Sequence, residues 1–244
     1  MGRGLWLAGG FWLILLFGAI PAQAQTVTLD LGEGGGELSS YVLRLIALIT
    51  LLSVLPGLAI TLTCFPFMLT VMSILRQGIG LQQAPPNMMM VAISLFLTWY
   101  VMDPVFTEAW ARGIGPYSRN EMEMIPAFEA AIEPFRSFMI GRIDAETFAR
   151  LDELRPRAET TVESAPLSLL MLSFMLCEIE RAFQVGYILY LPFLIIDLVV
   201  ASVLMSAGMM MVPPVAISLP FKLIFFVSVD GWSLITTALV RSYL

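Results

Sequence analysis

Long apolar runs, separated by shorter polar segments, set the pattern of this chain. The runs cover residues 41–75, 88–106, 167–184, 186–207 and 209–244. A transmembrane helix needs ~20 consecutive apolar residues, so these runs predict two hydrophobic helical hairpins, at 41–106 and 166–244. The first run is too long for one straight span and contains Pro56 and Pro66, which favours a broken or bent helix.

The segment 107–165 differs from the rest, because it holds eleven acidic and seven basic residues and no long apolar run. Helical spacing of apolar residues predicts one helix at 126–139. A second helix is predicted at 144–154, where Asp144 suits the N-cap and Ile143 and Phe148 have the spacing of a hydrophobic staple. We therefore expect a small water-facing helical region. Its apolar side chains should be buried against each other or against a neighbouring subunit: Phe128, Ile132, Phe135, Phe138 and Phe148.

The first 24 residues have the pattern of a secretory signal peptide. Arg3 supplies a positive charge, residues 5–20 are apolar, and Ala22-Gln23-Ala24 matches a small-x-small cleavage site. We expect cleavage between Ala24 and Gln25; an uncleaved N-terminal anchor is the alternative. The glycine-rich residues 25–40 then form a flexible periplasmic segment, and counting spans from there places 107–165 in the periplasm as well.

Composition narrows the class of protein. The 244 residues are 58% hydrophobic and only 13% charged, with a mean hydropathy of +0.85, which indicates an integral membrane protein or a subunit of an equally apolar assembly. The net charge of −6 lacks the basic footprint of a nucleic-acid-binding protein. The chain has no histidine, which excludes histidine acid–base catalysis and histidine metal ligands. We expect no catalytic site, metal or cofactor, and we expect Cys64 and Cys177 to be buried free thiols.

Ionisable residues inside apolar runs are costly and usually have a function. Asp197 and Asp230 could suggest an intramembrane aspartyl protease, which needs two facing carboxylates, but Lys222 competes as a partner for either one. If the chain reverses near Met210, Asp197 and Lys222 lie at the same level of two antiparallel helices, about 18 Å from the tip. We expect them to form a buried ion pair; the alternative is that each reaches water or another subunit alone. The further candidates for buried charges are Glu178, Arg181 and Asp230.

The same reversal places three consecutive methionines at a hairpin tip. Gly208, Pro213 and Pro214 flank Met209-Met210-Met211 and favour a break in the helix. Successive side chains on a helix point in different directions, so three adjacent methionines are unusual as core filler. Repeated around a ring, such tips would form a soft apolar collar that blocks hydrated ions yet yields to a passing polypeptide.

Several motifs of this sequence resemble the FliP family of flagellar export-gate proteins, whose injectisome relatives form the SctR group. They occur at 80–87, 101–105, 178–186 and 192–199, and in the C-terminal stretches 208–214, 218–222 and 229–232. Val212-Pro213-Pro214 and the signal peptide favour the flagellar branch. Cys177 departs from the serine that is usual in the family, which exchanges one small side chain for another.

The resemblance implies an all-α membrane protein built of long broken helical hairpins, with a small helical extracytoplasmic region, that assembles into a ring. It implies a non-enzymatic core subunit of the type III export gate in the bacterial inner membrane, at the flagellar basal body. The implied assembly is a pentamer joined by FliR and FliQ, with FlhB and FlhA nearby and FliO assisting assembly. The implied pore ring is lined by Met209 to Met211, and unfolded flagellar subunits pass through it.

Three alternative functions remain open from the sequence. An injectisome export-gate subunit would share the same motifs. An ion-coupled membrane transporter is favoured by broken apolar helices and buried charges, but it predicts inverted repeats, which the sequence lacks. A structural scaffold of the basal body without a pore is the third.

Overall fold

A computed structural model describes residues 42, 45–46, 49–50, 53, 57, 60–81, 85–155, 161–209 and 211–243. The chain divides into two compact units, 1–51 and 52–244. In the first unit the described residues are helical. The expected signal peptide with its cleavage site at Ala24 and Gln25, and the expected flexible segment 25–40, lie outside the described residues. The second unit contains the elements discussed below.

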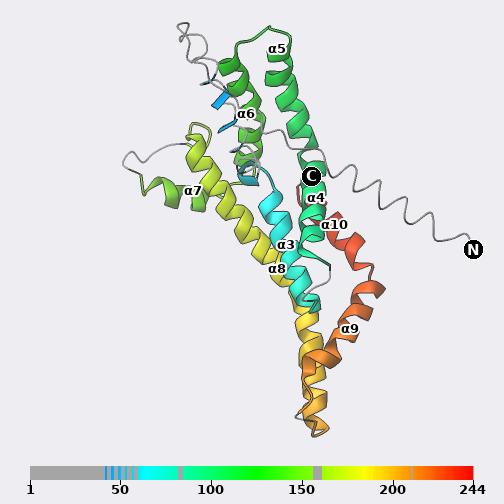
Figure 1. Ribbon diagram of the computed structural model, residues 1–244. Coiled ribbons are helices and arrows are strands. Elements are labelled where there is room, and N and C mark those ends of the chain that lie inside the picture. Colours follow the sequence, from blue (N-terminus) through cyan, green and yellow to red (C-terminus); the bar gives the residue numbers. More distant parts are fainter. Residues whose placement is uncertain are drawn as a thin grey trace, which may run out of the picture. The chain divides into compact units, whose positions relative to one another are not determined.

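The described residues of the second unit form helices joined by turns and irregular segments, with no strand among them (Figure 1), which confirms the all-α fold class. The elements in chain order are α3 (Phe65–Ile79), α4 (Asn87–Ala109), the π-helix η1 (Trp110–Ile114), α5 (Gly115–Ser118), α6 (Met124–Ile140), α7 (Ala145–Asp152), α8 (Leu167–Ser206), α9 (Pro214–Ser228) and α10 (Gly231–Arg241).

Helix α8 joins two apolar runs that the sequence separates. It continues for 40 residues, through the charged stretch around Glu178 and through Pro192. Glutamate, arginine and glutamine are good helix formers, so a change from apolar to charged residues does not end a helix. At ~1.5 Å per residue the helix is about 60 Å long, roughly twice the ~30 Å hydrocarbon core of a bilayer.

Helix α3 packs against α8 at two glycines that let the helices approach closely. A Cβ added at Gly186 would lie 2.4 Å from the Ile74 side chain, and one added at Gly78 would lie 3.0 Å from Phe193. Around these contacts the second unit builds its larger core, to which α3, α4, α8, α9 and α10 all contribute. The fully buried members of this core from α3 and α4 are Phe67, Met68, Val71, Met72, Leu75, Ile79 and Met102.

A smaller core lies where α6 and α7 meet the first half of α8. Its buried members are Met139, Phe148, Ala165, Leu169, Leu170 and Phe174, and Ile143 packs against them. The helices expected at 126–139 and 144–154 are present as α6 and α7. Asp144 is the N-cap of α7, and its carboxylate accepts hydrogen bonds from the backbone N–H groups of Glu146 and Thr147.

The apolar residues expected to be buried in 107–165 have mixed surroundings within the chain. Phe148 is buried, and Ile132, Phe135 and Phe138 are half-buried. Phe128 is 62% exposed, because α6 turns this position away from both cores. The apolar helix that precedes the segment also extends into it. The apolar helix continues past 106 through η1 and α5, supported by the Glu108–Arg112 ion pair at helical spacing.

Two apolar helical segments among the described residues are long enough to cross a membrane, Asn87–Ser118 and Leu167–Ser206. Helices α9 and α10 are bent by 62° relative to each other and reach the necessary length only as a pair. Helix α3 is apolar but has 15 residues, fewer than the ~20 that a straight span needs. By length and composition, the described part of the chain therefore offers two candidate spans, or three with the bent pair.

Candidate pore hairpin and buried charge networks

Helices α8 and α9 form a hairpin whose reversal follows from the local sequence (Figure 1). Gly208 adopts a left-handed backbone with φ of 74°, which a glycine adopts without steric cost. Its N–H donates to the Met205 carbonyl, and the Met209 N–H donates to the Leu204 carbonyl, the paired bonds that end many helices at such a glycine. Pro214 then starts α9 at its first position, where a missing N–H costs nothing.

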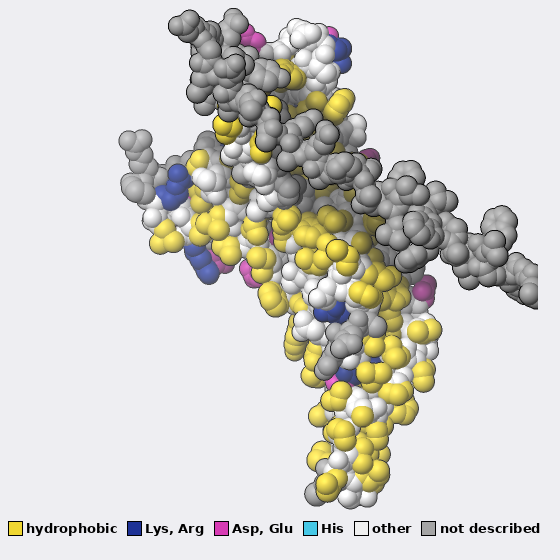
Figure 2. All heavy atoms as spheres, in the orientation of Figure 1, with side chains coloured by type: hydrophobic (Ala, Val, Ile, Leu, Met, Phe, Trp, Pro, Cys, Tyr) yellow, Lys and Arg dark blue, Asp and Glu magenta, His cyan; other side chains and the backbone are white. Residues whose placement is uncertain are grey.

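The hairpin tip carries exposed methionines. Met211 is 96% exposed and Met209 is 46% exposed; Met210 lies outside the described residues. Figure 2 shows hydrophobic side chains covering the visible face of this end of the molecule. Apolar side chains of α8 and α9 also line a shallow surface pocket of about 560 Å³. Among the described residues, the tip and its flanks are thus apolar and largely exposed.

The structure brings Asp197 and Lys222 together across the hairpin. Lys222 Nζ lies 2.6 Å from Asp197 Oδ2, and the Lys222 side chain is 5% exposed. The Ser218 hydroxyl donates to the other carboxylate oxygen at 2.6 Å, and Lys222 Nζ donates to the Gly78 carbonyl at 3.0 Å. Sequence reasoning missed both of these additional partners. Ser218 could have been found, because it precedes Lys222 by one helical turn and therefore shares its face.

Glu178 and Arg181 belong to a second network, in the first half of α8. The Glu178 side chain is fully buried and accepts from Arg142 Nε at 3.0 Å, from Arg181 at 3.4 Å and from the Tyr243 hydroxyl. Arg142 also donates to the Ser242 carbonyl at 2.9 Å and lies over the Tyr243 ring, 4.1 Å from its centroid. The network ties the loop after α6 and the end of the chain to α8.

The Tyr243 hydroxyl is a neutral hydrogen-bond donor in this network. Burial of the ring, followed by the negative charge of Glu178, raises the pKa of the Tyr243 hydroxyl above its ordinary value. A neutral phenol can donate its proton to the carboxylate, whereas a phenolate would repel it. Sequence reasoning missed Tyr243 and Arg142, since no spacing relates either residue to Glu178.

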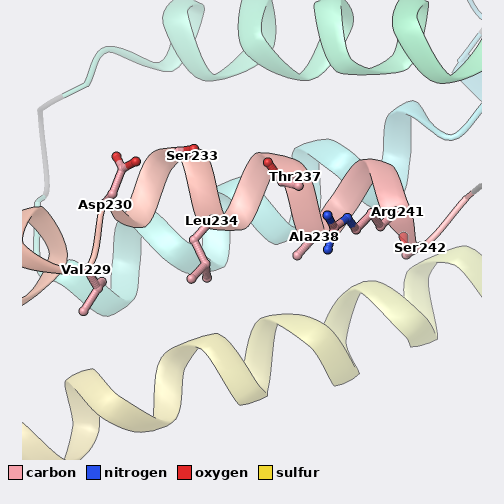
Figure 3. A pocket seen from close by; sticks show the side chains of 8 residues that line it. All are labelled: Val229, Asp230, Ser233, Leu234, Thr237, Ala238, Arg241 and Ser242. Carbon is pink, nitrogen blue, oxygen red and sulfur yellow. The ribbon is translucent and has the colours of Figure 1, made fainter.

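Asp230, expected as a buried charge, is exposed in the chain, which corrects that expectation. The residue adopts a left-handed backbone with φ of 48° at the bend between α9 and α10. The next residue must be small, because a Cβ at Gly231 would lie 2.3 Å from the Phe226 ring. The bend turns Asp230 outward, and Figure 3 shows it and Arg241 at opposite ends of a surface pocket of about 660 Å³ along α10.

The remaining chemistry of the described residues is limited. Cys64 and Cys177 are both buried and free, as expected. Within the described residues no group of three histidine, cysteine, aspartate or glutamate side chains could hold a metal ion. The described residues thus combine an apolar hairpin tip with two charge networks. One is the ion pair across the base of the hairpin, and the other links α8 to the loop after α6 and to Tyr243.

Comparison with known proteins assigns the family. The model of the FliP family matches residues 48–239. Proteins named flagellar biosynthetic protein FliP are similar to the chain: that of Caulobacter vibrioides is 47% identical over 226 residues, covering 91% of this chain and 84% of that protein. The protein of Rhizobium meliloti is 45% identical, covering 93% of this chain and 91% of its own length. The protein of Bacillus subtilis is 40% identical, covering 84% and 93%. The resemblance seen in the motifs is thereby confirmed, and the chain belongs to the FliP family.

Proposed function

We propose that this protein is a membrane subunit of the flagellar protein export apparatus, and that its hairpin tip, Met209 to Met211, forms the constriction of the export gate. Membership of the FliP family carries the first part, because the similar proteins are named for flagellar biosynthesis. The same names favour the flagellar function over the injectisome alternative. Two apolar helical segments long enough to span a bilayer support a location in the inner membrane.

The observation that carries the gate is the exposed tip. A methionine that is 96% exposed at the end of an apolar hairpin contributes almost nothing to the stability of its own chain. Thioether side chains are flexible and apolar, so a ring of such tips would dewet and exclude hydrated ions. The same flexibility would let the ring conform to an unfolded polypeptide without a fixed binding geometry. The tip is therefore suited to the two tasks of an export gate, which are to exclude ions at rest and to open for a passing polypeptide.

The exposed apolar surface beside the tip is available for assembly into a ring. Both arms of the hairpin carry large exposed apolar side chains, which either lipid or a partner subunit can cover: Ile195, Leu198, Val199, Val203, Val215, Phe221 and Ile224. We propose that further copies of the chain cover this surface, in a pentamer. FliQ and FliR are the proposed partners within the ring, FlhB and FlhA lie nearby, and FliO assists assembly.

The polar segment 107–165 fits a location on the periplasmic side. Its exposed ion pairs, Arg119–Glu121 and Arg150–Glu146, require water on that face. The division into a cleaved signal peptide, two hydrophobic hairpins and this periplasmic region is part of the proposal.

Replacing the tip methionines tests the gate. Met209, Met210 and Met211 are changed together to alanine, which removes the thioethers that narrow and dry the ring. We expect the complex to assemble and the resting membrane to leak small ions, measured as conductance or small-solute uptake in cells that make the complex. The matched control changes Met88, Met89 and Met124 to alanine, since these are also exposed methionines. A tip variant that assembles normally in a membrane as tight as the control would place the barrier elsewhere.

A further inference from the structure

Lys222 contacts a third element of the fold besides its acidic partner. Its ammonium donates to the backbone carbonyl of Gly78, in the last turn of α3, at 3.0 Å. The lysine is buried, whereas the side chain of Asp197 is 33% exposed. The contact with α3 is therefore the more enclosed of the two, and water can compete more easily for the carboxylate than for the carbonyl.

The last turn of α3 needs such a donor. The final carbonyls of a helix have no partner within the helix. Gly80, in a left-handed conformation with φ of 88°, closes the helix by donating its N–H to the Gln77 carbonyl. The carbonyl of Gly78 is another of these final carbonyls, and Lys222 donates to it. A cation at this end is further favoured by the negative end of the helix dipole, so Lys222 acts as the C-terminal cap of α3.

Helix α3 is closely packed against the rest of the fold, whereas the hairpin tip buries few side chains. Close contacts at Gly78 and Gly186 fix α3 against α8. Between residues 198 and 217, by contrast, Leu204 is the only buried side chain among the described residues. Lys222 lies at the boundary between these two regions. It joins α9, on the far side of the hairpin, to the fixed end of α3.

We propose that Lys222 is a positioning residue that fastens the base of the hairpin to the C-terminal end of α3, and that this cap, more than the ion pair with Asp197, sets where the tip lies. The consequence at the gate rests on the proposed function; the fastening itself does not. The two roles of Lys222 differ in what they require. The ion pair needs opposite charges in either order, whereas the cap needs a cation at position 222.

Three variants of the full chain, purified in its complex, separate the two roles. Asp197→Asn removes the carboxylate charge and leaves the cap. Lys222→Met removes both. The exchanged pair, Asp197→Lys with Lys222→Asp, keeps opposite charges across the hairpin but points a carboxylate at the Gly78 carbonyl, where two acceptors repel. Lys222→Arg is the conservative control, because it retains a cation that can donate to a carbonyl.

Amide hydrogen exchange in the last turn of α3, residues 75–81, is the readout. Loss of a hydrogen bond to a charged donor corresponds to roughly tenfold or greater acceleration of exchange when that bond limits local opening. We expect this acceleration in Lys222→Met and in the exchanged pair, little change in Asp197→Asn, and recovery in Lys222→Arg. Equal acceleration in Asp197→Asn and Lys222→Met, or recovery in the exchanged pair, would overturn the proposal and leave the ion pair as the fastening.

Ion leak through the membrane tests the link to the gate separately. We expect Lys222→Met to leak more than Asp197→Asn, because the tip loses its fixed position. If exchange follows the expected order while every variant keeps the membrane tight, the fastening stands and the proposed gate fails.

Discussion

The two halves of α8 have similar apolar sequences but different surroundings. From Leu169 to Phe193 the helix contributes a series of buried side chains to both cores, and Glu178 is fully enclosed. From Leu194 to Ser206 only Leu204 is buried. The first half packs against α6, α7 and α3, whereas the helix that lies beside the second half among the described residues is α9. An apolar residue therefore stabilises this fold in the first half and remains available to partners in the second.

The charge networks follow the same division. Glu178 is bound by three donors, of which Arg142 and Tyr243 lie outside α8, so the first half of α8 is cross-linked to two other parts of the chain. Asp197 and Lys222 make one cross-link at the start of the second half, and Ser218 is their neighbour within the same hairpin. Buried charges that lose a partner are costly. The comparison teaches that the chain itself fixes the first half, whereas the second half has one cross-link among the described residues and leaves its apolar surface open to the proposed partners.

The largest expected effect is that of Glu178→Gln. Removing the carboxylate charge leaves two guanidinium groups beside one neutral amide, and breaking a buried network of this kind costs about 3 kcal/mol in free energy of unfolding. We take the lower end of the usual range, because the side chains of Arg142 and Arg181 are 19% and 34% exposed. The measurement is denaturant unfolding of the purified chain. The control is Glu180→Gln on the exposed side of the same helix, and an equal loss in both variants would contradict a special role for Glu178.

A pair of neighbouring substitutions in the second half tests its dependence on partners. Leu204→Ala removes a buried side chain and should cost about 2 kcal/mol in the purified chain. Val203→Ala changes a side chain that is 59% exposed, and it should alter the stability of the purified chain by less than about 0.5 kcal/mol.

In the assembled complex we expect the difference between these two variants to shrink, because Val203 would then be covered. The measurement is the detergent concentration at which the complex dissociates, compared between the two variants and the wild type. If Val203→Ala leaves the assembled complex as stable as wild type, the exposed arm of the hairpin is not an interface.

A modest, pH-dependent effect is expected of Asp144→Ala at the N-cap of α7. Hydrogen bonds from backbone N–H groups, first of all that of Thr147, lower the pKa of the Asp144 carboxyl. Since the folded pKa is depressed, the stabilisation is complete above the unfolded pKa of about 3.9 and is lost as the pH falls through the folded value. We expect modestly faster amide exchange across residues 145–152 in the variant at neutral pH. Its difference from wild type should vanish in acid, and a difference that persists there would exclude the carboxylate as its source.

Local features were predictable from the sequence, because they depend on neighbours along the chain. The α7 cap at Asp144, the reversal at Gly208 and the meeting of Asp197 with Lys222 all follow from short spacings and helix geometry. The end of α4 and the continuity of α8 were harder to predict from the sequence. Charged residues such as Glu108 and Glu178 mark the end of an apolar run, but the helix continues through them.

Contacts between distant segments could not be read from periodicity. Arg142 and Tyr243 lie 36 and 65 residues from Glu178, and the Gly78 carbonyl lies 144 residues from Lys222. A backbone carbonyl has no signature in the sequence at all. Asp230 was misjudged for a related reason, since an aspartate inside an apolar run can still point outward where the helix bends.

The unbroken course of α8 has a consequence for how the molecule transmits geometry. A continuous helix fixes both the distance between two of its residues and their angular relation about its axis. Glu178 and Asp197 are held about 28 Å apart along that axis. Each residue inserted between them would lengthen the helix by about 1.5 Å and rotate everything beyond it by roughly 100°. The number of residues in the helix therefore determines both how far the methionine tip lies from Glu178 and in which direction around the helix axis it points.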